Sequence, residues 1–187
     1  MHDILTAPST SRAEAREMES LGIRLPSGDV GAPPEHPADR PPDPRRAVSA
    51  PGVLNEAYSY DRPSSFSRAL AFDMGGTTML LISGTASVDE AGETVHVGDF
   101  RAQLWRTFRN ITELLTAEGM TWHDIVRTTC YIRDIERDYQ DFNEVRTAFY
   151  EWLGLDPLPA STAIQARICR SDLLVEIEAM AVRTRER

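Results

Sequence analysis

The sequence predicts an α+β fold in which two helices pack on one face of a mixed sheet. Two stretches, at about residues 99–119 and 139–153, each carry a single apolar stripe at helical spacing. Short β-prone runs surround them, in the order strand, strand, strand, helix, strand, helix, strand, strand. Consecutive strands combined with alternation are typical of helices that cover one side of a sheet. We expect one folded domain over residues 55–187, preceded by a flexible Pro-rich extension over residues 1–54.

The N-terminal extension differs in composition from the rest of the chain. One or two turns of helix are expected within residues 11–21, where side chains of opposite charge are near neighbours. Residues 26–51 are predicted to be extended or disordered, because proline lacks a backbone donor and blocks helix. We expect a flexible arm, or a strap across a neighbouring subunit, with no chemistry of its own. The extension holds nine of the 12 prolines, namely Pro8, Pro26, Pro33, Pro34, Pro37, Pro41, Pro42, Pro44 and Pro51.

Charge and composition argue against several classes of function. With 187 residues and 41% hydrophobic side chains, the chain can bury a core of ordinary size. It has 29 Asp and Glu against 20 Arg and no Lys. The net charge of -9 argues against a nucleic-acid partner, because phosphate binding needs a basic surface. No apolar run reaches the roughly 18 residues of a membrane span. Only two cysteines occur, so a reducing cytoplasm is the expected location. The N-terminus lacks the features of a secretory signal.

The folded part is predicted to begin with a β-hairpin. Residues 66–72 and 78–83 are β-prone runs, and residues 73–76 between them have hairpin-turn chemistry. The second run is nearly continuous in apolar residues and predicts a central strand. Gly84 follows it and indicates a place where the backbone approaches another group closely. A third strand with an internal turn is expected within residues 87–97.

Both helices have terminal signals. The first is expected to begin at the N-cap Asp99 and to end at Gly119. The second has Gly154 just past its end. The stripe of the first helix comprises Leu104, Phe108, Ile111 and Leu115. The stripe of the second comprises Phe142, Val145, Phe149 and Trp152.

A strand is predicted between the helices, at residues 125–132. One of its faces carries Val126, Thr128, Cys130 and Ile132. We interpret Cys130 as a packed core thiol. Cys169 lies in a polar turn without a histidine partner, so neither cysteine is a persuasive nucleophile. Their spacing matches no metal or redox motif.

The closing segment predicts two short strands joined by a polar turn. In the last strand, one face is apolar and carries Leu173, Val175, Ile177, Ala179 and Ala181. The other face places Glu176 and Glu178 among apolar neighbours. Two such carboxylates line a cleft, pair with cations, or lie on the wet face of an edge strand. The pattern leaves these alternatives open.

Several blocks of the sequence resemble the RidA/YjgF family in order and spacing. They are FSRALAF, LLISGTASVD, FRAQLWRTFRNITELLTAEGMTWHDIVRTTCYIRDI, DFNEVRTAFYEWL, PASTAIQA and VEIEAMAV, over about residues 64–184. The resemblance implies a chorismate-mutase-like homotrimer with three clefts between subunits and no metal or organic cofactor. Members of the family hydrolyse enamine and imine intermediates to a 2-keto acid and ammonia. The implied partner is therefore a small acidic metabolite.

The chain departs from the family pattern at three positions. The arginine that follows PA and grips the substrate carboxylate is Ser161 here, and a nearby cysteine is Ala163. The aromatic residue of the first block, usually tyrosine, is Phe66. Glu176 takes the position of the carboxylate that orients the attacking water, and Ser83 is retained. A serine cannot form the bidentate ion pair that an arginine makes with a carboxylate, so the ordinary deaminase activity is expected to be weakened.

A second cation could compensate for the missing arginine. Arg146 stands at a cleft-lining position that is usually asparagine, and we hypothesise that it supplies the charge. The alternative is a solvated arginine paired with Glu144 or with a residue one turn away. Arg68, Arg167 and Arg170 are weaker candidates for the same role and are expected at the surface.

The expected site combines one catalytic residue with a set of binding residues. Glu176 should have its pKa raised by desolvation and by Glu178, which suits it to proton transfer near neutral pH. Backbone donors near Gly84 and Ala163 could receive a developing negative charge. The substrate-binding set comprises Phe66, Ser83, Gly84, Arg146, Ser161 and Ala163.

Three functions remain open at this level. The first is a cofactor-free hydrolase or deaminase, and SGTASVDEAGETVHVGDFRAQ also resembles chorismatases, which hydrolyse an enol ether. Chorismatases have a further N-terminal domain that residues 1–54 are too short to form. The second is a trimer that binds a small acid without turnover. The third is RNA binding, since the family has been labelled as endoribonuclease, and the acidic charge argues against it.

Overall fold

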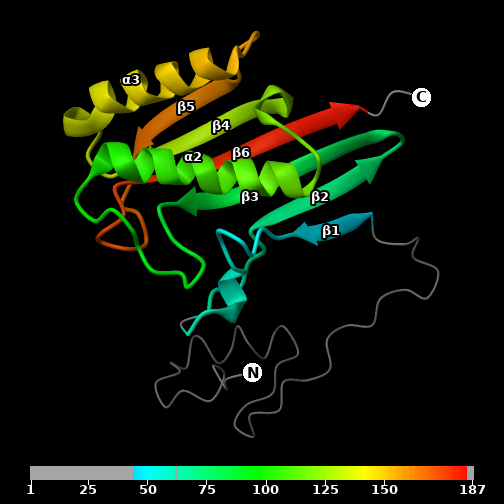
Figure 1. The fold of residues 1–187 in the computed structure, drawn as a ribbon, viewed down its shortest axis with the longest axis horizontal. Coiled ribbons are helices and arrows are strands. Elements are labelled where there is room, and N and C mark those ends of the chain that lie inside the picture. Colours follow the sequence, from blue (N-terminus) through cyan, green and yellow to red (C-terminus); the bar gives the residue numbers. More distant parts are fainter. Residues whose placement is uncertain (1–43, 62, 185–187) are drawn as a thin grey trace, which may run out of the picture. The chain divides into compact units, whose positions relative to one another are not determined.

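A computed structural model describes residues 44–61 and 63–184 (Figure 1). Six strands form one sheet in the order β1-β2-β3-β6-β4-β5. Neighbours are antiparallel except β4 and β5, which are parallel, so the sheet is mixed as predicted. Two long helices lie on one side of it. The elements are β1 Arg45–Val48, η2 Ala57–Ser59, β2 Ala69–Met74, β3 Thr77–Ala86, α2 Phe100–Ala117, η3 Trp122–Asp124, β4 Ile125–Ile132, α3 Ile135–Leu153, β5 Ala160–Gln165 and β6 Val175–Thr184.

The predicted hairpin is present as β2 and β3. Gly75 and Gly76 form its two-residue turn with φ of 56° and 95°, values that residues with a β-carbon rarely adopt. β3 lies between β2 and β6, which confirms it as a central strand. The third strand predicted at residues 87–97 is wrong. That stretch makes one isolated bridge, and the Asp89 carboxylate accepts hydrogen bonds from two nearby backbone amides, which closes a loop instead.

The helix ends follow the predicted local signals. Asp99 caps α2 by accepting a hydrogen bond from the backbone of Ala102 at 3.0 Å, and Gly119 follows its end with φ 66°. α3 begins at Ile135, earlier than predicted, because Asp134 serves as its N-cap. Gly154 ends α3 in the left-handed conformation, as expected.

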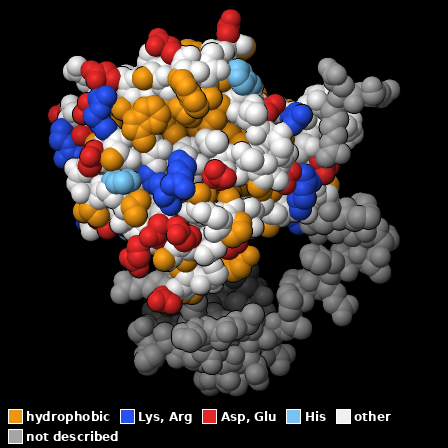
Figure 2. Space-filling view, in the orientation of Figure 1, with side chains coloured by type: hydrophobic (Ala, Val, Ile, Leu, Met, Phe, Trp, Pro, Cys, Tyr) orange, Lys and Arg blue, Asp and Glu red, His pale blue; other side chains and the backbone are white. Residues whose placement is uncertain are grey.

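The core lies between the helices and the sheet. The apolar face of β6 is buried as predicted, and Cys130 is 1% exposed. The predicted burial of Trp152 is wrong, because its side chain is 78% exposed and stacks on Phe149 from the outside. Val126 is also exposed, at 42%, because the register shifts between Ile125 and Arg127 and turns it off the buried face. Figure 2 shows hydrophobic side chains gathered on the surface over α2 and α3.

One strand was missed. Arg45–Val48 form β1, which pairs antiparallel with β2 inside the Pro-rich stretch that the sequence left extended or disordered. The compact unit that contains the sheet therefore begins at Pro44. The short helix expected at residues 11–21 lies outside the described residues, and the domain boundary at residue 54 stays a prediction.

Two buried amides fix the loops at one end of the sheet to α2. Gln103 donates to the carbonyl of Asp172 and accepts from the amide of Leu174, both at 2.8 Å. Asn110 donates to the carbonyls of Ala86 and Val88 at 3.0 and 2.9 Å. Both amides are fully buried, so the loops that they hold are positioned by the helix.

Asn110→Ala is expected to destabilise the fold by about 1–3 kcal/mol, because two hydrogen bonds of about 0.5–1.5 kcal/mol each are lost. The carbonyls of Ala86 and Val88 each keep a second donor, the amide of Val88 and Nε of Arg106. The free energy of unfolding in urea measures the change. Arg109→Ala, at the exposed neighbouring position, is the control and should stay within about 0.5 kcal/mol of wild type. Equal stability of both variants would contradict the assigned role of Asn110.

Candidate active site

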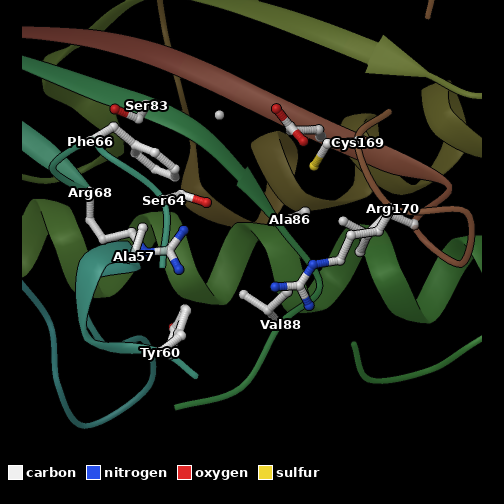
Figure 3. A pocket seen from close by; sticks show the side chains of 13 residues that line it. Ala57, Tyr60, Ser64, Phe66, Arg68, Ser83, Ala86, Val88, Cys169 and Arg170 are labelled. Carbon is white, nitrogen blue, oxygen red and sulfur yellow. The ribbon is translucent and has the colours of Figure 1, made fainter. Parts of the chain in front are cut away.

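A cavity of about 300 Å³ opens at the end of the sheet where β3 finishes (Figure 3). Three segments form its walls: the chain between η2 and β2, the last residues of β3, and the turn that precedes β6. Its lining residues are Ala57, Tyr60, Ser64, Phe66, Arg68, Ser83, Gly84, Ala86, Val88, Cys169, Arg170, Leu173 and Glu176. The predicted residues Phe66, Ser83, Gly84 and Glu176 are thus brought together.

Glu176 reaches the cavity through a bulge in the neighbouring strand. In β6 it lies opposite Ala86 of β3 on one side and Tyr131 of β4 on the other. The register between β3 and β6 shifts at Ser83 and Gly84. A β-carbon at Gly84 would overlap the Glu176 carboxylate, so only glycine leaves room for it. The close approach expected at Gly84 is therefore present, and the group that approaches is the carboxylate.

Burial and charge perturb this carboxylate. Desolvation raises the pKa of Glu176, the nearby Glu178 raises it further, and Arg68 acts in the opposite direction. Glu178 lies on the same face of β6, two residues along the strand. Burial and Glu178 also raise the pKa of Tyr131. The sequence left open whether Glu176 lines a cleft, pairs with a cation or lies on a wet face. In the structure its half-buried side chain lines a cavity that also contains the cation Arg68.

Arg68 is the main departure from expectation. The sequence placed it at the surface, whereas it is only 7% exposed. Its Nε donates to the carbonyl of Asn55 at 2.9 Å. Its guanidinium carbon lies 5.3 Å from the ring centroids of both Tyr60 and Phe66, within range of a cation–π attraction. This burial depends on the segment around η2 folding over the start of β2, which no local sequence pattern indicates.

The remaining wall residues have distinct roles. Ser83 donates its hydroxyl to the carbonyl of Ser67 at 2.8 Å, which ties the end of β3 to the start of β2. Phe66 is 40% exposed at the mouth of the cavity. Tyr60 lines the cavity and donates to the carbonyl of Asn55 at 2.9 Å. Cys169 and Arg170 also line it, and the sequence had given Cys169 no role.

Arg146 and Ser161 lie elsewhere. Arg146 donates through Nη1 to the Ser161 hydroxyl at 3.1 Å and through Nη2 to Asn143 at 2.6 Å. Its alternative partner Glu144 instead binds Arg101. Arg146 and Ser161 share a separate cavity of about 390 Å³ with the end of α3 and the loop before β5. Arg146 thus contacts Ser161, the residue that stands where the family resemblance implies an arginine.

Within one chain, the expected site residues form two groups on opposite faces of the sheet. Ser161 pairs with Thr128 and Ala163 pairs with Cys130, and both β4 residues are buried beneath the helices. Glu176 pairs with Tyr131, which points to the other face. A single chain therefore does not assemble the complete set.

The described residues offer no cluster suited to a metal ion. No group of three or more His, Cys, Asp and Glu side chains is arranged to hold one there. None of the helices in the same part of the chain combines the length and apolarity needed to cross a bilayer.

The fold and the cavity define a small α+β protein with a perturbed carboxylate at the end of its sheet. The family described as Endoribonuclease L-PSP matches residues 61–183, and the chain belongs to this family, which includes the RidA/YjgF proteins. The crystal structure of the YjgF gene product from E. coli has 25% sequence identity and a TM-score of 0.60, with 74% of this chain and 98% of that chain covered.

Two relatives carry names of activities. The 2-iminobutanoate/2-iminopropanoate deaminase of Salmonella typhimurium is 31% identical over 111 residues, covering 59% of this chain and 83% of that protein. The 3-aminoacrylate deaminase RutC of Acinetobacter baylyi is 28% identical over 103 residues, covering 55% of this chain and 78% of that protein. A deaminase-like role on small imine or enamine metabolites is thus supported at the level of the family.

Replacing Glu176 by glutamine is expected to change how stability depends on pH. The fold raises the pKa of this carboxyl above its ordinary value of 4.5, so the folded state holds the proton more tightly than the unfolded state. The stability that the fold gains from this tighter proton binding is fully present below pH 4.5 and is lost as pH rises through the folded pKa. Wild type should therefore lose stability relative to Glu176→Gln across this window, as measured by thermal unfolding at a series of pH values.

Glu178→Gln provides the control for this experiment. It removes the neighbouring negative charge, so the pKa of Glu176 should fall. The pH range over which this carboxyl lowers the stability of the fold should then become narrower. Parallel stability curves for wild type and Glu176→Gln would contradict a raised pKa.

Proposed function

We propose that the chain is a cofactor-free hydrolase that deaminates an imine or enamine of a small acidic metabolite at a cleft between subunits. One observation carries the proposal: the half-buried Glu176 carboxylate, with a raised pKa, packs against the bare backbone of Gly84 in a cavity. Perturbed carboxylates in cavities are typical of proton-transfer sites. The deaminase names of the two relatives support the reaction class.

The reaction needs one water molecule and proton transfers. Glu176 in its ionised form would accept a proton from a water that attacks the sp² carbon of the protonated imine. The resulting carbinolamine would receive that proton on nitrogen and give its hydroxyl proton to the ionised Glu176. The C–N bond would then break to release ammonia, which takes up the proton held by Glu176. The carbonyl oxygen of the 2-keto acid product comes from the water. Backbone donors near Gly84 would stabilise negative charge that develops on oxygen.

A homotrimer would complete the site. The division of the residues into two groups on opposite faces supports a cleft in which one copy supplies Glu176 and its neighbour supplies Arg146. The face of the sheet away from the helices offers apolar area for such an interface. Its side chains include Leu70, Phe72, Met79, Leu81, Met180 and Val182. The proposed location is the cytoplasm.

Two departures support a second candidate, a trimer that binds a small acid without turnover. Ser161 stands where the deaminases have arginine, and Phe66 lacks a hydroxyl. A chorismatase-like hydrolysis of an enol ether is the alternative chemistry, in which Glu176 would protonate the substrate. RNA binding is disfavoured by the net charge of -9, although the family is described as an endoribonuclease.

The direct test is the release of ammonia and 2-keto acid from an imine generated in situ by a pyridoxal-phosphate enzyme. We expect wild type to accelerate release and Glu176→Gln to lower kcat by about 10²–10⁴-fold, the usual contribution of general acid–base catalysis. Circular dichroism checks that the variant is folded. Equal turnover by wild type and Glu176→Gln would sink the assigned role of the carboxylate.

Ser161→Arg tests whether the scaffold is a deaminase with a different ligand. If wild type is inactive and Ser161→Arg gains activity, the machinery is intact and the native ligand is not the imine supplied. If neither is active while a keto acid raises the melting temperature of wild type, the binding trimer is the better description.

The shared cleft makes a separate prediction. Arg146→Ala and Glu176→Gln should each lower activity strongly when purified alone. Unfolding and refolding the two variants together should restore a measurable fraction of activity, because some clefts then combine an intact Arg146 with an intact Glu176 from neighbouring copies. Absence of recovery in trimers that have exchanged subunits would contradict a cleft built from two chains.

A further inference from the structure

The cavity around Glu176 is positively charged, although the chain as a whole is acidic. Its described lining contains two arginines, Arg68 and Arg170, and one carboxylate, Glu176. The chain carries a net charge of -9. A net positive lining in an acidic protein favours an anionic ligand, because local charge determines what a small cavity binds.

Arg68 is held in place before any ligand arrives. Its backbone amide donates to Glu56 at 3.1 Å, its Nε donates to the carbonyl of Asn55, and its guanidinium lies between two aromatic rings. These contacts use Nε and the flat face and leave the two terminal nitrogens. Figure 3 shows the Arg68 guanidinium turned into the cavity. A fixed guanidinium loses little entropy when it binds a carboxylate.

Arg170 reaches the cavity from the opposite wall. Figure 3 shows its side chain extending toward Arg68. One terminal nitrogen donates to the carbonyl of Gly92, and its own carbonyl accepts from Arg133. Gln103 fixes the same turn through its bonds at residues 172 and 174. The turn is therefore anchored on both sides of Arg170.

Neither arginine is paired with a carboxylate in the part of the chain that the structure describes. The ion pairs there involve other arginines. Arg68 lowers the pKa of Glu176 by its charge but makes no ion pair with it. Both guanidinium groups keep terminal nitrogens that bind no carboxylate of the described residues, and the carboxylate of a ligand in the cavity could accept hydrogen bonds from them.

We propose that Arg68 and Arg170 form a two-arginine subsite that binds a carboxylate of the ligand within a single chain. Within one chain, Ser161 cannot provide this contact and Arg146 lies on the opposite face of the sheet. The subsite is therefore separate from any contact made by the Arg146 of a neighbouring copy. The subsite places the acid group beside Tyr60 and Phe66, with the reacting carbon toward Glu176. The proposal takes from the proposed function only that this cavity holds the ligand, and it does not depend on turnover.

Isothermal titration of the full chain with 2-oxobutanoate and with its neutral amide tests the subsite. Arg68→Gln and Arg170→Gln should each weaken binding of the acid at least tenfold and leave binding of the amide unchanged. Arg167→Gln is the matched control, because this exposed arginine precedes the same turn and does not line the cavity. Arg68→Lys should recover part of the affinity, since it keeps the charge but not the fork.

The outcomes separate this inference from the proposed function. Acid binding that is lost in both arginine variants and kept in Glu176→Gln supports the subsite even when no variant shows turnover. Acid affinity that is unchanged in Arg68→Gln and Arg170→Gln overturns it, whatever the activity of wild type. Should Arg68→Gln unfold, Arg170→Gln decides, because that side chain extends from a surface turn and is only half-buried.

Discussion

The close contact between the Glu176 carboxylate and the backbone at Gly84 is the constraint on which the cavity depends. The register of β3 against β6 shifts between Ile82 and Thr85, and pairing resumes beyond this bulge. The missing side chain at Gly84 leaves space that the carboxylate fills. The same contact takes the carboxylate out of water and so raises its pKa. A defect in the sheet thus creates the polar centre of the cavity.

Local signals predicted much of the fold, and long-range contacts account for what they missed. Asp99 and Gly154 mark helix ends through their own backbone preferences, and alternation along the last strand predicted which face of β6 is buried. The bulge that exposes Val126 depends on how β4 meets β6. The burial of Arg68 depends on a segment folding over it. Neither effect leaves a pattern in the neighbouring sequence.

The sequence named candidate site residues but did not indicate how they are distributed in space. The strand pattern selected Gly84 and the family resemblance selected Glu176 and Ser83, and the structure brings these three to one cavity. It also named Ser161 and Arg146, which contact each other on the other face. Pairing in β4 and β5 decides this, because residues opposite a buried position share its face. The sequence shows how side chains alternate between the two faces of each strand. It does not show which strands will be neighbours in the sheet.

The proposed separation of the anion contacts, Arg68 and Arg170, from the proton-transfer group Glu176 has a physical consequence for selectivity. At physiological salt, charges more than about 8 Å apart are largely screened, so the acidic surface acts weakly on a small acid inside the cavity. There the arginines are near and partly desolvated, and their attraction is stronger than it would be in water. A long polyanion would remain outside, facing the surface with its net negative charge. With the proposed two-arginine subsite, the same chain would attract small carboxylates and repel nucleic acid.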